Sequence, residues 1–405
     1  MLQRFAFFVT AVLLLTSPRL ALAQRWTATW GSAQMRASNS DLPKQTFDGA
    51  TLRQVVHTSL GGTSVRVRVS NAFGDRPLAI RSVHLAVAQR ISAGIVEPEL
   101  QHEVRFAGHG GVTIPVGADY VSDAVSILLP AQSDMAITFE IAQAPGGITA
   151  HPGSRATSYI VAGQHALDRV LASAEAVSHW YFLSAVDVQC APSSAAIVAL
   201  GDSITDGHGA KDDANERWTD VLARRLGGSK LSVVNRGIGG GRVLNDGLGP
   251  NALSRFDRDV LATPGARYLI VLEGVNDLGT LDRTEAHSSQ IHAALVFQLE
   301  DAYVQIVRRA HDNGITVIGA TVMPYMGSDY YHPSAQSEAD RQALNTWIRT
   351  SGTFDSVIDF DAVARDSVHQ DRLGKEFDSG DHLHPSGEGY KRMGEFISIA
   401  LFKLH

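Results

Sequence analysis

The sequence predicts two domains, an all-β sandwich of jelly-roll-like kind at residues 24–190 and a three-layer α/β/α domain at residues 191–405. Three observations lead to this prediction. The length of 405 residues is more than one compact domain usually holds. Before residue 190 the segments are short and β-like, whereas after it short apolar runs alternate with amphipathic stretches. Hydrophobic residues make up 44% of the chain and charged residues 19%, a balance typical of folded proteins.

The first 23 residues are typical of a cleaved secretory signal peptide. Arg4 precedes an apolar stretch at 5–15, and Ala21-Leu22-Ala23 is a small-residue cleavage site. The apolar stretch is too short to cross a bilayer, and no later segment is long and apolar enough. We therefore expect a mature chain that begins near Gln24, is secreted or periplasmic, and has no membrane span.

Charge and cysteine content exclude several kinds of partner and site. The formal net charge is −7, and it becomes −9 when Arg4 and Arg19 leave with the signal peptide. Such an acidic chain argues against nucleic acid as a partner. Cys190 is the only cysteine in the sequence, so neither an intramolecular disulfide nor a cysteine-based zinc site can form. The sequence does not indicate an oligomeric state.

The N-terminal half shows the two-residue period of strands. Residues 64–70 alternate strictly, which places three valines on one face of a strand. Glycine and proline clusters separate this segment from its neighbours and mark turns. Further strands are predicted at 80–88, 126–129 and 135–141. Several short strands with turn signals favour a sandwich.

In the C-terminal half, buried strands alternate with helices. The predicted strands are 196–200, 232–235, 268–272, 316–320 and 356–360. The predicted helices are 217–226, 291–311, which ends before Asn313-Gly314, and 387–404. This alternation predicts a parallel sheet with helices on both faces.

Three polar motifs directly follow predicted strands, and a fourth lies between the fifth strand and the last helix. They are 201–205 after the first strand, 235–242 after the second, 273–277 after the third and 381–385 after the fifth. In open α/β sheets, ligands bind at the carboxyl ends of the strands. We therefore expect the four motifs to meet at one edge of the sheet and to form one site.

The residue types in these motifs suit nucleophilic catalysis. The hydroxyl of Ser203 is a poor nucleophile until a base takes its proton, and a histidine such as His384 can serve as that base. A carboxylate three residues earlier, Asp381, can orient the imidazole and stabilise its charged form. An oxyanion needs fixed donors, which the glycine run 239–241 and the amide of Asn276 can supply.

The four motifs resemble the blocks of the SGNH (GDSL) hydrolases, in the family's order. This resemblance implies a flavodoxin-like hydrolase domain in which Ser203 is the nucleophile and Asp381 and His384 complete the triad. It implies an oxyanion hole made by the backbone N–H groups of Ser203 and Gly240 and the side-chain amide of Asn276. Gly241 is the alternative to Gly240. The resemblance implies no metal and no organic cofactor.

Three N-terminal stretches resemble a subgroup of that family that carries a β-rich domain in front of the hydrolase. These are Trp30-Gly31-Ser32, 53–57 and Val69-Ser70-Asn71. Members of this subgroup are often described as esterases of acylated plant polysaccharides such as acetylated xylan. The resemblance therefore implies a secreted serine esterase of acyl, foremost acetyl, esters, with an acylated carbohydrate or another small ester as substrate.

Other functions remain open at this point. A lipase or lysophospholipase would need an enlarged apolar pocket, and a catalytically weak carbohydrate-binding protein would not need the triad. A glycosidase would use two carboxylates in place of a serine. A metal site at Asp381, His382 and His384 would leave the serine motif unexplained. Thr205 disfavours the G-x-S-x-G elbow of the α/β-hydrolase fold.

The remaining polar and aromatic residues near these motifs have structural interpretations. Asp202 is expected to hold the serine loop through side-chain to backbone bonds, and Asp277 to brace the loop of the third motif. Glu273, at the end of a buried strand, needs a charged partner. Asp206 and His208 are expected to lie near the site. The tryptophans Trp26, Trp30 and Trp180 fit core packing better than sugar stacking.

Overall fold

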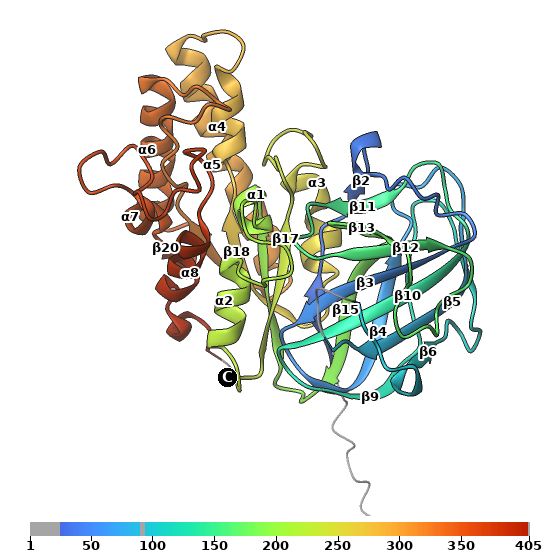
Figure 1. The fold of residues 1–405 in the computed structure, drawn as a ribbon. Coiled ribbons are helices and arrows are strands. Elements are labelled where there is room, and N and C mark those ends of the chain that lie inside the picture. Colours follow the sequence, from blue (N-terminus) through green and yellow to red (C-terminus); the bar gives the residue numbers. More distant parts are fainter. Residues whose placement is uncertain (1–24, 90–93, 404–405) are drawn as a thin grey trace, which may run out of the picture.

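The structure, a computed structural model, describes residues 25–89 and 94–403. It contains a β-rich domain and an α/β domain that lie side by side, coloured blue to green and green to red in Figure 1. The predicted signal peptide at residues 1–23 lies outside the described residues. No helix in the described part of the chain has the length and apolar character needed to cross a membrane.

The N-terminal domain consists of antiparallel sheets around one hydrophobic core. The first sheet contains β1 (Arg25–Gly31), β15 (Leu183–Cys190), β4 (Gly62–Ser70), β8 (Asp119–Val121) and β9 (Val125–Leu129). The second contains β13 (Glu175–Val177), β12 (Ser158–Ala162), β3 (Ala50–Thr58), β10 (Ser133–Gln143), β5 (Leu78–Val87), β6 (His102–Val104) and β7 (Val112–Ile114). A small third sheet contains β14 (His179–Tyr181), β11 (Thr149–Pro152) and β2 (Met35–Arg36).

In β4, the valines of residues 64–70 lie on one face of the strand, as the alternating sequence predicts. Val65, Val67 and Val69 are buried in the core, whereas the arginines between them are partly exposed and bind Asp187. The prediction of an antiparallel β-rich domain is thus confirmed, and the jelly-roll connectivity stays a prediction.

The C-terminal domain is built on a parallel sheet in the order β17-β16-β18-β19-β20. Its strands are β16 (Ala195–Gly201), β17 (Leu231–Gly237), β18 (Ala266–Leu272), β19 (Thr316–Ala320) and β20 (Ser356–Ile358). Numbered from the first strand of this domain, the order is 2-1-3-4-5, which is that of flavodoxin-like sheets. The prediction of a parallel α/β domain is therefore confirmed.

Two groups of helices pack around this sheet. One group contains α2 (Trp218–Arg225), α7 (Phe360–Ala364) and α8 (Gly387–Phe396), with the short α1 (Ser203–Asp206) beside β17. The other contains α3 (Ala252–Phe256), α4 (Val275–Leu281), α5 (Ser289–His311) and α6 (Ala335–Thr350). The sequence prediction did not include α1, α3, α4, α6 or α7.

Two predicted elements run at least two residues too far toward the C-terminus. The last strand ends at Ile358 instead of residue 360, because the Asp359 side chain accepts the N–H of Ala362 and starts α7. The final helix ends at Phe396 instead of residue 404. There, the Arg225 guanidinium donates to the carbonyls of Gly394 and Ile397, both at 2.6 Å, which satisfies the end of the helix.

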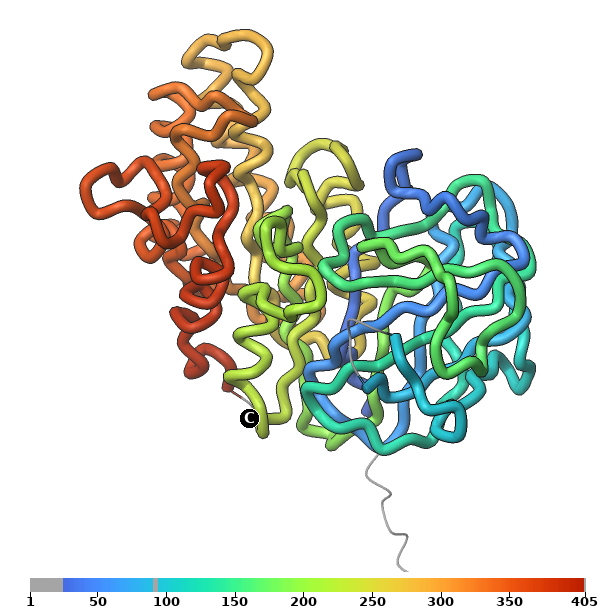
Figure 2. Tube along the Cα trace, in the orientation of Figure 1, coloured from blue at the N-terminus to red at the C-terminus, as the bar shows by residue number. Residues whose placement is uncertain are grey.

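A short junction connects the β-rich domain to the α/β domain. The two domains also pack directly against each other. β15 ends at Cys190, and β16 begins at Ala195. β1 packs against β17, where the Ser232 hydroxyl donates to the carbonyl of Ala28 at 2.6 Å. Figure 2 shows the green segments near residues 150 and 205 side by side at this boundary. The β-rich domain therefore lies directly beside the loop that follows the first parallel strand.

Candidate active site

The polar loops at the carboxyl edge of the parallel sheet surround one cleft. Its volume is about 650 Å³, and Ser203, Gly240, Asn276, Asp381 and His384 all line it. These five residues come from four loops that lie far apart in the sequence. The structure therefore brings together every residue that the sequence analysis selected for the site.

Ser203 is placed by a sharp strand-to-helix turn. The fully buried β16 ends at Gly201, and Ser203 is the first residue of α1. The Asp202 carboxylate accepts the N–H of Ile204 at 2.8 Å and so caps this helix. Gly207 ends the helix in the left-handed conformation, with φ +98°. Asp202 therefore holds the serine loop as expected.

A hydrogen-bonded chain links Ser203, His384 and Asp381. The Ser203 hydroxyl lies 2.8 Å from Nε2 of His384, and Nδ1 of the same ring lies 2.6 Å from Oδ2 of Asp381. The other carboxylate oxygen of Asp381 accepts the N–H groups of Leu383 and His384 at 3.0 and 2.8 Å. The aspartate is thus fixed by its own loop.

The surroundings of Asp381 keep it ionised. Partial burial favours the protonated form, but hydrogen bonds from the ring and backbone of His384 outweigh it and hold the pKa of Asp381 well below its usual range. A carboxylate can only accept, so Nδ1 of His384 carries the proton that joins the two side chains. The lone pair of Nε2 then faces the Ser203 hydroxyl, which is the arrangement that a general base requires.

Two backbone N–H groups at this edge are free to bind an anion. Neither the N–H of Ser203 nor that of Gly240 donates to another of the described residues. Gly241 differs, since its N–H donates to the Ile238 carbonyl at 2.9 Å. Gly240 also has φ +68°, a conformation that glycine adopts without strain. The geometry thus favours Gly240 over Gly241 as a donor, and the oxyanion role itself stays a prediction.

Asn276 approaches the same point from the first turn of α4. Its side-chain amide donates to the Gly241 carbonyl at 2.6 Å, and its Oδ1 accepts the hydroxyl of Tyr331. An amide nitrogen carries two hydrogens. The second hydrogen of Asn276 has no partner among the described residues and is available to the cleft.

A group of buried carboxylates lies beneath the serine loop. Burial raises the pKa of Asp202 to about 7 and that of Asp277 to about 6, and it raises the pKa of Glu273 well above its usual value. The Arg255 guanidinium binds Glu273 at 3.0 Å, while the second oxygen of Glu273 has no hydrogen-bond partner. Glu273 therefore has the charged partner that its position requires.

Asp277 connects two of the loops around the cleft. Its carboxylate accepts the N–H groups of Val243 and Leu244 at 2.8 and 3.1 Å. These two residues follow Arg242, the last residue of the second motif. Asp277 therefore ties the end of the second motif to the segment that carries Asn276.

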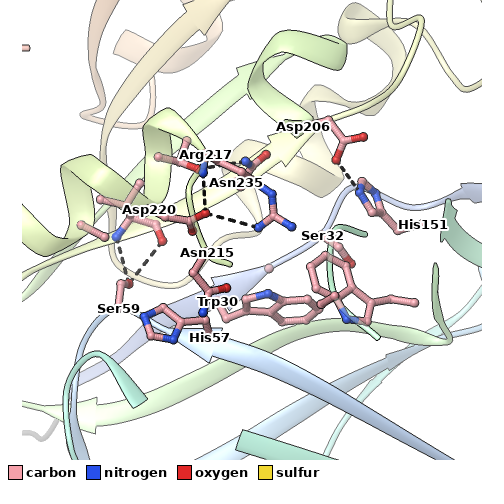
Figure 3. A pocket seen from close by; sticks show the side chains of 16 residues that line it. Trp30, Ser32, His57, Ser59, His151, Asp206, Asn215, Arg217, Asp220 and Asn235 are labelled. Atoms are coloured by element: carbon pink, nitrogen blue, oxygen red, sulfur yellow. Dashed lines mark hydrogen bonds and ion pairs between the residues drawn. The ribbon is translucent and has the colours of Figure 1, made fainter. Parts of the chain in front are cut away.

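The β-rich domain contacts the other end of α1. His151 of β11 lies 2.7 Å from the Asp206 carboxylate, and both side chains are buried. Figure 3 shows these two side chains facing each other across the domain boundary. The cavity lined by the residues in Figure 3 has a volume of only about 30 Å³, too small for a substrate. This region is therefore a packed interface.

A second contact from the β-rich domain reaches the rim of the cleft. Arg155 lies 3.3 Å from Nδ1 of His208, whose ring centre lies 4.1 Å from that of His384. Burial, with the neighbouring His384 and Arg155, lowers the pKa of His208. Sequence reasoning missed His151, Arg155 and Tyr331, because no local motif marks them and only the tertiary contacts reveal them.

Cation binding at this edge would compete with the hydrogen-bonded chain. The ligand atoms of His208, Asp381 and His384 lie within 4.8 Å of one another. Both ring nitrogens of His384 already have partners, so a cation there would have to displace the Ser203 contact. His382, which the metal interpretation of the sequence also requires, instead binds the Asp378 carboxylate at 2.5 Å.

Trp30 and Trp180 occupy the core positions that packing predicts, whereas Trp26 is partly exposed and lies outside the core. Trp30 and Trp180 are buried and meet edge to face, with ring centres 4.8 Å apart. Trp26 is covered by the guanidinium of Arg66, 4.5 Å from its ring centre. The tryptophans of the N-terminal domain therefore provide no open sugar-stacking surface at the cleft.

The parallel sheet and the serine at its carboxyl edge define the class of protein, a serine hydrolase with an α/β fold. Residues 199–392 match the model of the GDSL-like Lipase/Acylhydrolase family. The α/β domain is thus a member of this family, and the protein is a serine ester hydrolase.

Several solved structures are similar to about half of this chain. A GDSL-like lipase from Bacteroides thetaiotaomicron is 20% identical, with a TM-score of 0.38, and the match covers 51% of this chain and 87% of that one. A lipase/acylhydrolase from Enterococcus faecalis is 21% identical, with a TM-score of 0.38 and coverage of 50% and 92%. An acetyl xylan esterase is 17% identical, with a TM-score of 0.38 and coverage of 51% and 100%. No curated protein matches the chain.

Proposed function

We propose that this protein is an exported esterase that removes acyl, foremost acetyl, groups from polysaccharides or oligosaccharides. One observation carries the proposal: Ser203, His384 and Asp381 form a continuous hydrogen-bonded chain in a cleft that Gly240 and Asn276 also line. In this proposal Ser203 is the nucleophile, His384 the general base and Asp381 the residue that orients it. The reaction requires no metal and no organic cofactor.

The first half of the reaction is acylation of Ser203. His384 Nε2 takes the hydroxyl proton while Ser203 Oγ attacks the ester carbonyl carbon. The negative charge that develops on the carbonyl oxygen is stabilised by the N–H groups of Ser203 and Gly240 and by the free amide hydrogen of Asn276. Asp381 stabilises the imidazolium. His384 then protonates the leaving alcohol oxygen, which departs and leaves an acyl-enzyme.

The second half releases the acid. A water molecule enters from the open side of the cleft and gives a proton to His384 as its oxygen attacks the acyl carbon. The same donors stabilise the second oxyanion. The bond to Ser203 Oγ breaks, His384 returns the proton to it, and the carboxylic acid leaves.

The proposed substrate class rests on the cleft and on the resemblance of the N-terminal stretches. The rim of the cleft contains the half-exposed ring of Tyr330, which the Arg283 guanidinium covers on one side at 4.1 Å from the ring centre, and the carboxylate of Asp329. An exposed aromatic ring beside a polar acceptor suits a sugar ring and its hydroxyls. The signal peptide predicted at residues 1–23 would deliver the enzyme to polysaccharides outside the cytoplasm.

The test is hydrolysis of p-nitrophenyl esters from acetate to octanoate by the chain without residues 1–23. Rapid cleavage of acetate that falls with chain length, together with acetate release from acetylated xylan, is the expected result. Ser203→Ala should lower kcat by about 10⁴-fold or more, because the acyl-enzyme can no longer form.

Each of the other results points to a different protein. A preference for octanoate would identify a lipid esterase, for which the exposed Leu248 at the cleft would supply apolar surface. Activity that survives Ser203→Ala would contradict the mechanism. Binding of xylan without cleavage of any ester would identify a carbohydrate-binding protein.

A further inference from the structure

Tyr331 occupies a place at the cleft that the triad and the oxyanion donors do not explain. It lies in the loop between β19 and α6, and its side chain is buried. Its hydroxyl donates to Oδ1 of Asn276. The tyrosine is therefore joined to the one side-chain donor of the proposed oxyanion hole.

The ring of Tyr331 is held where this hydrogen bond requires it. Tyr330 packs edge to face against it, with ring centres 4.7 Å apart, and Tyr325 does so at 6.2 Å. Gly279 of α4 also packs against the Tyr331 ring, and a Cβ added at this glycine would lie 2.6 Å from the ring. Only glycine lets the helix that carries Asn276 approach the ring so closely.

Two hydrogen bonds fix the amide of Asn276 in one orientation. Its oxygen faces the donor Tyr331, and its nitrogen faces the acceptor Gly241 at 2.6 Å. Rotating the amide by half a turn would set its oxygen against the Gly241 carbonyl and its N–H₂ against the tyrosine hydroxyl. The Gly241 carbonyl opposes that rotation because it can only accept, and the bond from Tyr331 adds a second point that holds the amide in the direction Gly241 selects.

We propose that Tyr331 is a positioning residue of the oxyanion hole, which aims the free N–H of Asn276 at the carbonyl oxygen of the ester. This inference rests on the proposed esterase function. Preorganised donors stabilise developing charge because they need not reorient during the reaction. Without the hydroxyl, the Gly241 carbonyl alone holds the amide, which is then less firmly aimed, and the transition state loses part of one donor while the substrate still binds.

The test compares Tyr331→Phe with Tyr325→Phe on p-nitrophenyl acetate. Tyr325 is the matched control, because it is a buried tyrosine of the same loop whose hydroxyl has no hydrogen-bond partner among the described residues. Tyr331→Phe should lower kcat by about 10- to 100-fold with KM nearly unchanged, somewhat less than the loss of a whole oxyanion donor. Tyr325→Phe should keep the wild-type kcat.

A double-mutant cycle separates positioning from general packing. In an Asn276→Ala background the hydroxyl has no amide to aim, so adding Tyr331→Phe should lower kcat no further. Incorporation of 4-aminophenylalanine at position 331 keeps an N–H donor on a ring of the same shape and should restore most of the rate. This replacement also tests the proposal if the phenylalanine variant does not fold.

Three results would overturn the inference. The first is an active wild-type enzyme whose kcat is unaffected by Tyr331→Phe. The second is an equal loss of kcat in the presence and absence of the Asn276 amide. The third is a 4-aminophenylalanine variant no faster than Tyr331→Phe. Failure of the proposed function itself is distinct, since the wild-type enzyme would then hydrolyse none of the esters.

Discussion

Two histidine–aspartate pairs hold the two ends of the four-residue helix α1. At its start, His384 lies between Ser203 and Asp381, with a carboxylate distance of 2.6 Å. At its end, His151 binds Asp206 at 2.7 Å. The two pairs have the same chemistry at nearly the same distance. They differ in the group that faces the ring nitrogen not bound to the aspartate.

The partner of that second nitrogen separates the two roles. Nε2 of His384 faces a hydroxyl that can give up its proton, at the edge of an open cleft. Nδ1 of His151 faces the Ala33 carbonyl at 2.7 Å, which can only accept. His151 must therefore keep its Nδ1 proton, whereas His384 is free to gain and lose one. A histidine–aspartate pair performs acid–base chemistry only where the other nitrogen meets a proton that can move.

The comparison also assigns a role to the β-rich domain. His151 belongs to that domain, and Asp206 is the last residue of the helix that Ser203 begins. The Arg217 guanidinium adds a hydrogen bond to the carbonyl of Ser154 from the same side. The domain thus supports α1, which begins with the proposed nucleophile Ser203, through contacts that lie outside the cleft.

The largest expected effect comes from Asp381→Asn. The amide can donate to Nδ1 of His384 and so favours the tautomer in which Nε2 carries the proton and cannot accept one from Ser203. We expect kcat on p-nitrophenyl acetate to fall by about 10³- to 10⁴-fold, while the thermal midpoint changes little because the residue is partly exposed.

Asp206→Asn is the matched control for that substitution, because it makes the same change in the pair that is expected to be structural. It should lower kcat by less than about tenfold. Comparable losses in the two variants would remove the distinction between the pairs.

The second effect is on stability and comes from His151→Ala. This change leaves the buried Asp206 carboxylate without its partner, which costs about 3 kcal/mol in the free energy of unfolding. Urea unfolding followed by circular dichroism measures it. Because α1 loses its rear support, kcat should also fall about tenfold.

His57→Ala is the control for that prediction. His57 also belongs to the β-rich domain and binds a carboxylate, Asp134, at 2.7 Å, but the two side chains are 18% and 22% exposed, and among the described residues His57 has no hydrogen bond to α1. This substitution should lower the free energy of unfolding by less than about 1 kcal/mol and leave kcat unchanged. A kcat for His151→Ala equal to that of the wild type would show that the β-rich domain does not position the nucleophile.

The residues of the proposed triad could be selected from the sequence because they directly follow a strand or precede a helix. Ser203 comes two residues after β16, and Asp381 and His384 come just before α8, so local pattern and sheet topology place them together. His151 and Tyr331 act through contacts with residues 55 positions away in each case, and nothing in their own segments marks them.

The helix α6 shows why one element of the fold was missed. Its core-facing positions include Asp340, Arg341 and Asn345, which are buried together with Leu344 and Ile348. These polar residues interrupt the apolar period by which a helix is identified in a sequence. Their burial is possible because Arg341 binds Asp361 at 2.7 Å and Asn345 binds the backbone of Val322, partners that only the folded chain brings near.

The smallest expected effect concerns Asp202, the carboxylate that caps α1 beside Ser203. Burial raises its pKa from 3.8 to about 7, so between these two values the folded protein holds a proton that the unfolded chain has released. This group therefore makes stability fall as the pH rises from about 4 to 7, and its contribution is constant above that range. Asp381, whose pKa is lowered, has the opposite effect: its contribution to stability is lost as the pH falls into the acidic range.

Asp202→Asn should remove that slope while keeping an oxygen that accepts the Ile204 N–H. The difference in melting temperature between variant and wild type should therefore grow in favour of the variant from pH 4 to pH 7 and reach a few degrees. Thermal unfolding at unit intervals of pH measures it. Asp366→Asn is the control, because that carboxylate is exposed and its pKa is lowered by backbone N–H groups. If the curves of Asp202→Asn and the wild type stay parallel over this range, Asp202 is ionised in the folded protein, and the serine loop is capped by a buried charge instead of a neutral acid.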